Sequence, residues 1–123
     1  ASFALVPRPG DTRHTVLVLA DPQTQDSYET GLLHAETVPD VVRTVQGLGD
    51  RTVLGVACGD IMFDDLALYP EWERAVTRMG VPFLQVIGNH DLDFASRTAE
   101  GASATFRGRF GPTYHSFDMG AVH

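Results

Sequence analysis

Three short polar runs follow apolar runs in this sequence, and their residue types suit metal or phosphate chemistry. Asp21 and Gln23 follow the first apolar run, and Asp60 follows the second. Asn89 and His90 come directly after the third. Carboxylate, amide and imidazole groups are ligands for Mn²⁺, Fe, Zn²⁺ or Mg²⁺. We therefore expect a site for divalent cations, in which the carboxylate of the middle run can bridge two of them.

Each motif also has a simpler interpretation as local structure. Gly, Asn and Asp are common turn formers, so the run GNHD at 88–91 can be a plain turn. Asp60 after Gly59 can cap a helix, and Asp64 and Asp65 suit the start of one. The combination of three such runs favours the functional interpretation over the local one.

The apolar runs before these motifs predict three β-strands. They are rich in β-branched residues and are bounded by turn formers. The first is almost wholly apolar, so we expect it to be buried on both faces of a sheet. The strands are predicted at residues 14–20, 52–58 and 81–87.

Helices are predicted between these strands and after them. Apolar residues at helical spacing predict one helix over residues 38–48 and a second over 69–79. A weaker helical segment covers roughly residues 97–109. Residues 113–123 are predicted to form a β-hairpin that turns at Asp118–Gly120.

Strands that alternate with helices indicate an α/β fold, here in the order βαβαβ followed by a hairpin. Such a fold has a mostly parallel sheet with right-handed crossovers. The carboxyl ends of parallel strands lie at one edge of the sheet, where open α/β folds bind their ligands. The polar residues after the three strands should therefore converge, although they are far apart in the sequence.

Composition excludes some classes of partner. The chain has 123 residues, enough for one small domain, and a net charge of −7 in which every basic residue is arginine. This acidity argues against nucleic-acid and anionic-membrane binding, and no apolar run is long enough to span a bilayer. The single Cys58 follows an apolar run, so we expect a buried, unreactive thiol.

The first residues of the chain differ in composition from the rest. Residues 1–13 contain Pro7, Pro9 and Gly10 and are expected to be an extended leader or linker, with one domain at 14–123. The chain does not begin with Met, so we expect it to be a piece of a longer precursor. The compartment stays open, and an extracytoplasmic location after removal of a signal is one alternative.

Taken in order, the motifs D-x-(H/Q), G-D and G-N-H-D resemble those of the calcineurin-like metallophosphoesterases. Here they read DPQ at 21–23, GD at 59–60 and GNHD at 88–91. Gln23 stands where His is usual, which resembles a DPQ-type variant of that family. The resemblance implies an αββα metallophosphoesterase sandwich, truncated to roughly its first half over residues 14–123. It also implies two divalent metal ions, with Mn, Fe, Zn or Mg as the alternatives.

The resemblance further implies metal ligands among the residues of this chain. Asp21 and Gln23 would bind the first metal ion, Asn89 would bind the second, and Asp60 would bridge the two. An amide oxygen at Gln23 is a weaker, neutral ligand than an imidazole, which affects the affinity or identity of the first metal.

Catalytic roles follow from the same resemblance. His90 would act near the leaving group as a general acid or as a donor to the phosphate. Asp64 would orient His90, and Asp91 would lie behind the metal ligands.

These roles give a first hypothesis, in which phosphate mono- or diesters of small molecules are hydrolysed through a metal-bound hydroxide. The family's later ligands, an isolated His and a G-H-x-H motif, are not found in this chain, so the chain alone is expected to be inactive. The alternative is a non-catalytic metal- or ligand-binding module of the same fold. Sheet edges left open by the missing half are expected to favour self-association.

Overall fold

A three-stranded parallel sheet organises the protein. The computed structural model describes residues 13–49 and 51–119, so nearly all of the predicted leader lies outside the described residues. The strands lie in the order β1-β2-β3 and comprise His14–Ala20, Thr52–Cys58 and Phe83–Val86. The prediction of three parallel strands is confirmed, and the third strand is shorter than predicted at both ends.

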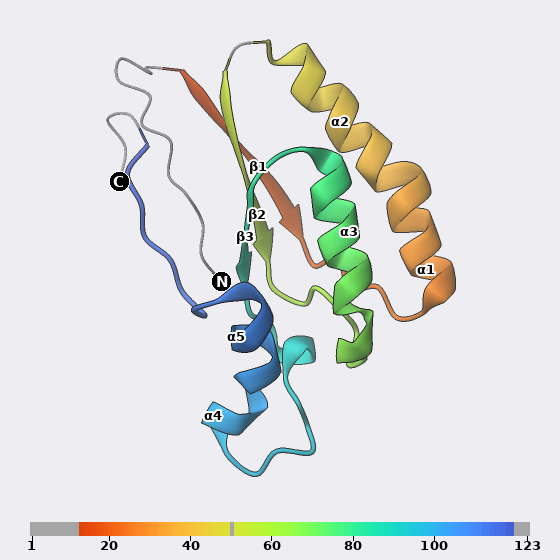
Figure 1. The fold of residues 1–123 in the computed structure, drawn as a ribbon, viewed down its shortest axis with the longest axis vertical. Coiled ribbons are helices and arrows are strands. Elements are labelled where there is room, and N and C mark those ends of the chain that lie inside the picture. The colour runs from red at the N-terminus through yellow and green to blue at the C-terminus, as the bar shows by residue number, and fades with distance from the viewer. Residues whose placement is uncertain (1–12, 50, 120–123) are drawn as a thin grey trace.

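Helices connect the strands and extend beyond them (Figure 1). Between β1 and β2, one continuous helical stretch consists of α1 (Ser27–Leu32), a π-helical segment (Leu33–Thr37) and α2 (Val38–Gly47). Between β2 and β3, a short 3₁₀ turn (Leu66–Leu68) leads into α3 (Tyr69–Met79). After β3 come a 3₁₀ turn (Asn89–Asp91), α4 (Ala99–Ala102) and α5 (Ala104–Phe110).

The first helical stretch begins earlier than its apolar spacing predicts. Asp26 caps α1, since its carboxylate accepts the backbone N–H groups of Tyr28 and Glu29, each at 2.9 Å. The Glu29 carboxylate in turn accepts the N–H of Gln25 at 2.7 Å. The Asp26 carboxylate thus satisfies two orphan donors at the helix start, and Glu29 holds the residue before the cap, in a pattern related to a capping box. The D-x-x-E spacing at 26–29 is the signal that an apolar-periodicity analysis overlooks.

One face of the sheet carries the hydrophobic core. In Figure 1, α2 and α3 lie on the same side of the sheet, and α4 and α5 lie beyond the carboxyl ends of the strands. Trp72, Tyr69 and Phe106 are fully buried in this core. The ring of Phe83 packs edge-on against Trp72, with ring centroids 6.2 Å apart, and it covers Gly55 of the neighbouring strand. The predicted helix 69–79 is confirmed, and it anchors the core.

The opposite face of the sheet is apolar but accessible. Val16 and Val18 of β1 are 44% and 60% exposed, so the prediction that this strand is buried on both faces is wrong. Cys58 at the end of β2 is also exposed, which corrects the expectation of a buried thiol. Among the described residues, the helices between the strands cover only one side of the sheet, and this explains both differences.

The segment after β3 departs from the prediction in two ways. The single helix expected over residues 97–109 is divided into α4 and α5 at Ser103. Residues 113–118 form no strand, so the first arm of the predicted hairpin is wrong, and most of its second arm lies outside the described residues. An imidazole nitrogen of His115 instead lies 3.2 Å from the carbonyl oxygen of Gln85 in β3.

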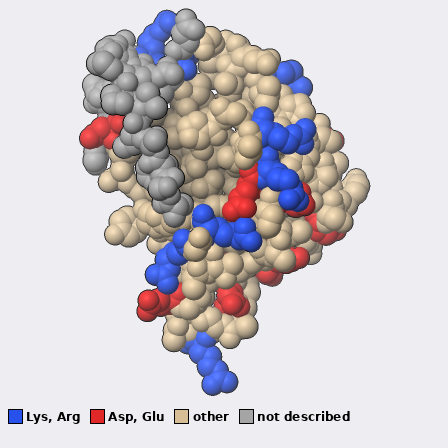
Figure 2. Space-filling model, in the orientation of Figure 1, with Lys and Arg blue, Asp and Glu red and all other residues tan. Residues whose placement is uncertain are grey.

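Charged side chains of both signs alternate on the face shown in Figure 2. On α3, Arg74 pairs with Glu71, and Glu73 pairs with Arg109 of α5 at 3.0 Å. Arginines held by glutamates in this way present little net positive charge to a polyanion. In the described part of the chain, no helix is long and apolar enough to cross a membrane.

Candidate functional site

The loops after β1 and β2 are joined by backbone hydrogen bonds. The N–H of Gln23 donates to the carbonyl of Asp60 at 2.8 Å, and the N–H of Phe63 donates to the carbonyl of Thr24 at 3.0 Å. Thr24 and Met62 form a parallel β-bridge between these two contacts. The two loops therefore continue the parallel pairing beyond the end of the sheet.

The loop after β3 is tied to the loop after β2 through Asp60 and Asp64. The Asp60 carboxylate accepts the backbone N–H of His90 at 3.0 Å, and the N–H of Asp64 donates to the carbonyl of His90 at 3.3 Å. Gly88 lies so close to Asp60 that a Cβ at position 88 would overlap its backbone nitrogen and carboxylate. A glycine at 88 is thus required by close approach of the two loops.

Asp91 is a fully buried carboxylate that holds this junction from inside. It accepts the backbone N–H groups of Gly88 at 2.9 Å, Ile61 at 3.1 Å and Met62 at 3.3 Å, and the hydroxyl of Tyr69 at 3.2 Å. Burial raises the pKa of Asp91, while the three backbone donors and Tyr69 oppose the rise. Burial, together with the nearby Asp91 charge, also raises the pKa of Tyr69. Asp91 therefore joins β2, β3 and α3 where the polar loops begin.

His90 is contacted on one edge and one face of its ring. Its Nδ1 lies 2.8 Å from a carboxylate oxygen of Asp64, as expected from the sequence. The ring of Phe63 stacks on the imidazole with centroids 4.3 Å apart and planes at 23°. Within the described residues, Nε2 has no hydrogen-bond partner. The hydrogen bond with Asp64 raises the pKa of His90, against the opposing effect of desolvation.

Four polar residues of these loops adopt a left-handed backbone conformation. The φ angles are 44° at Asp21, 46° at Gln23, 44° at Asp60 and 64° at Asp64. Asp tolerates this region better than most residues, whereas Gln has no such preference. Strained residues of this kind cluster at functional sites, where the surrounding structure fixes them. Here the cross-loop hydrogen bonds supply that constraint.

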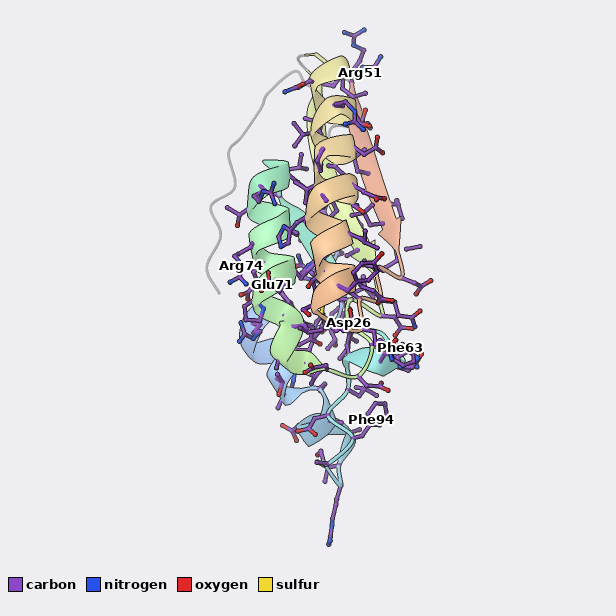
Figure 3. All side chains as sticks on the ribbon, turned by 90° about the vertical axis from the view of Figure 1, so that its right-hand side faces the viewer. Asp26, Arg51, Phe63, Glu71, Arg74 and Phe94 are labelled. Atoms are coloured by element: carbon purple, nitrogen blue, oxygen red, sulfur yellow. The ribbon has the colours of Figure 1, made fainter. Side chains whose placement is uncertain are left out.

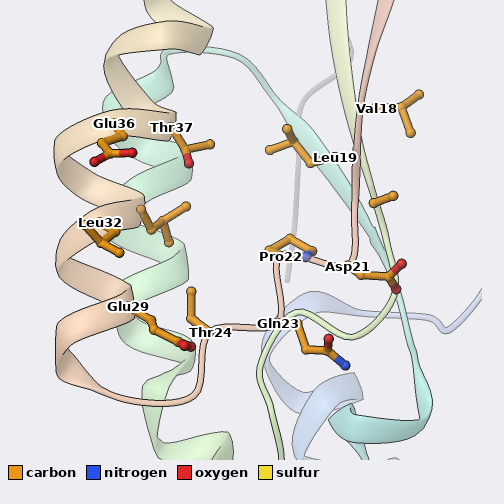
Figure 4. A pocket seen from close by; sticks show the side chains of 12 residues that line it. Val18, Leu19, Asp21, Pro22, Gln23, Thr24, Glu29, Leu32, Glu36 and Thr37 are labelled. Carbon is orange, nitrogen blue, oxygen red and sulfur yellow. The ribbon is translucent and has the colours of Figure 1, made fainter.

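Asp21 and Gln23 leave the end of β1 on the side away from α1 and α2 (Figure 4). On the helical side, a hollow of about 590 Å³ lies between the end of β1 and the α1–α2 stretch, with Glu29 and Glu36 among its lining residues. Asp21 and Gln23 are also among the lining residues of this hollow, so it reaches the strand end that carries two of the predicted ligands. Asn89, beside His90, is exposed.

The predicted metal ligands are oxygen donors at one edge of the sheet. Asp60 uses one carboxylate oxygen for the N–H of His90, and Asp21 is exposed at the adjoining strand end. In residues 13–49 and 51–119, no group of three or more His, Cys, Asp or Glu side chains is arranged to hold a metal ion. The candidate donors at this edge are the carboxylates of Asp21 and Asp60 and the amide oxygens of Gln23 and Asn89.

Two residues at this edge have contacts that the sequence does not specify. Phe63 contacts His90, and no spacing rule marks it, because the stacking depends on how two loops meet. Asp91 belongs to the GNHD run, yet it faces the interior while Asn89 and His90 do not. Its position directly after His90, in a run of turn formers, gives no signal of burial. Asp65, considered above as a helix-start residue, does cap the 3₁₀ turn through the N–H of Ala67 at 3.0 Å.

Comparison of the chain with protein-family models, with curated proteins and with solved structures finds no significant match.

Proposed function

We propose that the chain contributes the first part of the active site of a metal-dependent phosphoesterase. The observation that supports this most is the junction around His90, where Asp64 holds Nδ1 and leaves Nε2 without a partner in the described structure. The Asp60 carboxylate accepts the His90 backbone N–H in the same junction. An oriented imidazole beside a carboxylate is the arrangement that proton transfer to a phosphoester leaving group requires.

His90 acts as the general acid in this proposal. Because the hydrogen bond that Nδ1–H donates to Asp64 raises the pKa of His90, a larger fraction of the imidazole is protonated near neutral pH. Nδ1–H stays with Asp64, so Nε2–H is the proton given to the departing alkoxide oxygen. Asp64 also stabilises the imidazolium before transfer, in the role that a carboxylate plays behind a catalytic histidine.

Divalent cations fit the donor chemistry of the adjoining residues. Carboxylate and amide oxygens of Asp21, Gln23, Asp60 and Asn89 are hard ligands of the kind that Mg²⁺ or Mn²⁺ accept. When bound, such cations act as Lewis acids on phosphoryl oxygens. The chain's own contribution is to hold Asp60 rigidly, through its backbone contact to Gln23 and its side-chain contact to His90. The apolar face of the sheet opposite α2 and α3 supports an αββα arrangement, in which a second sheet would cover Val16 and Val18.

A second candidate function is a metal- or ligand-binding module without catalysis. It is favoured by the small number of charged ligands, since no three acidic, cysteine or histidine side chains of the described residues are arranged to hold a metal ion. In that case the loops would bind a cation or an anion weakly and His90 would have no leaving group to protonate.

The test is metal binding and hydrolysis measured together. In the protein that carries this chain, we expect Mn²⁺ to bind in calorimetry and to support hydrolysis of an aryl phosphate, and Asp60→Asn to abolish both. Asp40→Asn is the matched control, because Asp40 is exposed on α2 and forms an ion pair with the exposed Arg43, one helical turn away. Binding without turnover in the protein that carries this chain would favour the module. Wild-type metal content and turnover in Asp60→Asn would refute the assignment of Asp60.

A further inference from the structure

Phe63 is the residue that covers the face of the His90 imidazole, and no motif assigns it a role. We infer that Phe63 is a positioning residue, which fixes the plane of the His90 ring so that Nδ1 faces Asp64 and Nε2 faces outward. The packing of Phe63 on His90 follows from the geometry alone. Its effect on proton transfer from His90 rests on the proposed function.

Consecutive residues of one loop contact His90 from two directions. Asp64 reaches Nδ1 at the ring edge at 2.8 Å, and Phe63 stacks on the ring face at 4.3 Å between centroids. Neighbouring side chains of an extended chain point to opposite sides. The left-handed φ of 64° at Asp64 changes that geometry, so both side chains reach the same ring.

The loop that carries Phe63 is held at several points. The backbone N–H of Phe63 donates to the carbonyl of Thr24 at 3.0 Å, and the carbonyl of Phe63 accepts the N–H of Asp65 at 2.8 Å. The backbone N–H of the next residue, Asp64, donates to the backbone carbonyl of His90 at 3.3 Å. Phe63 is half-buried, and in Figure 3 it lies on the opposite side of the molecule from Glu71 and Arg74 of α3. The aromatic ring therefore presents a fixed surface to the imidazole.

A face contact supplies a constraint that a single hydrogen bond does not. A hydrogen bond at Nδ1 fixes one point of the ring and leaves the imidazole free to tilt about it, so the direction of Nε2 varies. Stacking with planes at 23° removes that freedom. Because transfer of a proton needs the donor atom within about 3 Å of the acceptor and correctly directed, loss of the stack is expected to slow a reaction that uses Nε2.

Phe63→Leu, Phe63→Tyr and Phe94→Leu separate positioning from general packing. Phe63→Leu removes the ring and keeps apolar bulk, and Phe63→Tyr restores the ring. Phe94→Leu is the matched control, because Phe94 is 66% exposed. The readout is the proton NMR spectrum of the His90 ring, assigned by its loss in His90→Gln. We expect Phe63→Leu alone to abolish the upfield ring-current shift of the His90 ring protons, and Phe63→Tyr to retain it.

Hydrolysis supplies the second readout, in the protein that carries this chain. We expect Phe63→Leu to lower kcat about 10- to 100-fold for an alkyl phosphate, with little change for 4-nitrophenyl phosphate, whose leaving group needs no proton. Phe63→Tyr should restore the rate.

The outcomes distinguish the two ideas. Unchanged His90 ring signals in Phe63→Leu, or equal losses for the alkyl and nitrophenyl substrates, would overturn the positioning role. An intact ring-current signature without any metal-dependent hydrolysis would overturn the proposed function and the catalytic consequence, and would leave the packing of Phe63 on His90 established.

Discussion

Replacing Asp91 by Asn tests how the polar loops are held together. The two side chains have nearly the same shape, so packing is preserved while acceptor capacity changes. The buried carboxylate receives four donors, the N–H groups of Gly88, Ile61 and Met62 and the hydroxyl of Tyr69. An amide offers one oxygen and one NH₂ group, and the NH₂ group cannot accept a hydrogen bond.

The cost of this substitution can be estimated from the contacts. The better orientation places the amide oxygen at the Oδ1 position, which receives Ile61, Met62 and Tyr69. The NH₂ group then faces the N–H of Gly88, which loses its acceptor. A buried donor without a partner costs about 1–3 kcal/mol. The repulsion between the two N–H groups adds to this cost, and removing a buried charge subtracts from it. We expect a net loss of about 2 kcal/mol in the free energy of unfolding.

The pH dependence of stability supplies an internal check. Burial raises the pKa of Asp91 above its unfolded value, so the folded protein binds this proton more tightly. The stabilisation from proton binding is complete below the unfolded pKa and is lost as pH rises through the folded pKa. Asp91→Asn lacks this ionisation, so the difference in stability between the two proteins should shrink as pH rises through that window.

The assay is urea unfolding followed by far-ultraviolet circular dichroism, with Asp40→Asn as the control. Asp40 lies on the surface of α2 and pairs with Arg43 at 2.9 Å, so its loss should cost less than about 0.5 kcal/mol. Equal midpoints for Asp91→Asn and Asp40→Asn, with the same dependence on urea concentration, would refute the bridging role of Asp91.

Three further predictions concern the rest of the fold and site. Asp64→Asn should lower the pH midpoint of His90 in an NMR titration in the presence of a chelator, because the Asp64 hydrogen bond raises that pKa; an unchanged midpoint would argue against the contact. Gly88→Ala should destabilise the protein by more than about 2 kcal/mol in urea unfolding, because its Cβ would overlap backbone. Gly47→Ala, which meets nothing within 4 Å, should instead stabilise it by about 0.5–1 kcal/mol. Val18→Lys should reduce self-association in light scattering while changing the free energy of unfolding by less than about 1 kcal/mol. Undiminished association would show that the open apolar face is not its cause.

The strands and the second crossover helix could be predicted because their signals are local. β1 and β2 have the predicted bounds, since runs of β-branched residues end at turn formers. The helix over 69–79 has a clear apolar periodicity and ends at Gly80 with a φ of 70°. The start of α1 was missed because Asp26 acts through a cap rather than through apolar spacing. Exposure of Val18 was missed because which faces of a sheet are covered depends on tertiary structure.

In the candidate site, too, features with local signals could be predicted and features that depend on tertiary contacts could not. Convergence of the loops that carry Gln23, Asp60 and His90 follows from parallel topology, which the sequence indicates. The stacking of Phe63 and the burial of Asp91 depend on how three loops fold against one another, and a turn-forming composition is compatible with many such arrangements. Long-range contacts of this kind have no counterpart in residue spacing.

The small residue under Phe83 has a consequence for how the strands find their partners. A shift of β3 by one position along β2 would place Leu84 and Val86 on the core face in place of Phe83 and the buried Gln85, so hydrophobicity alone does not favour the observed register. Gly55 removes that ambiguity, since a Cβ there would meet the aromatic ring at 2.5 Å. Its neighbours are Leu54 and Val56, so either misalignment forces a branched side chain beneath the ring. The missing Cβ of Gly55 therefore favours the observed register of β3 on β2, which places the carboxyl ends of the two strands side by side.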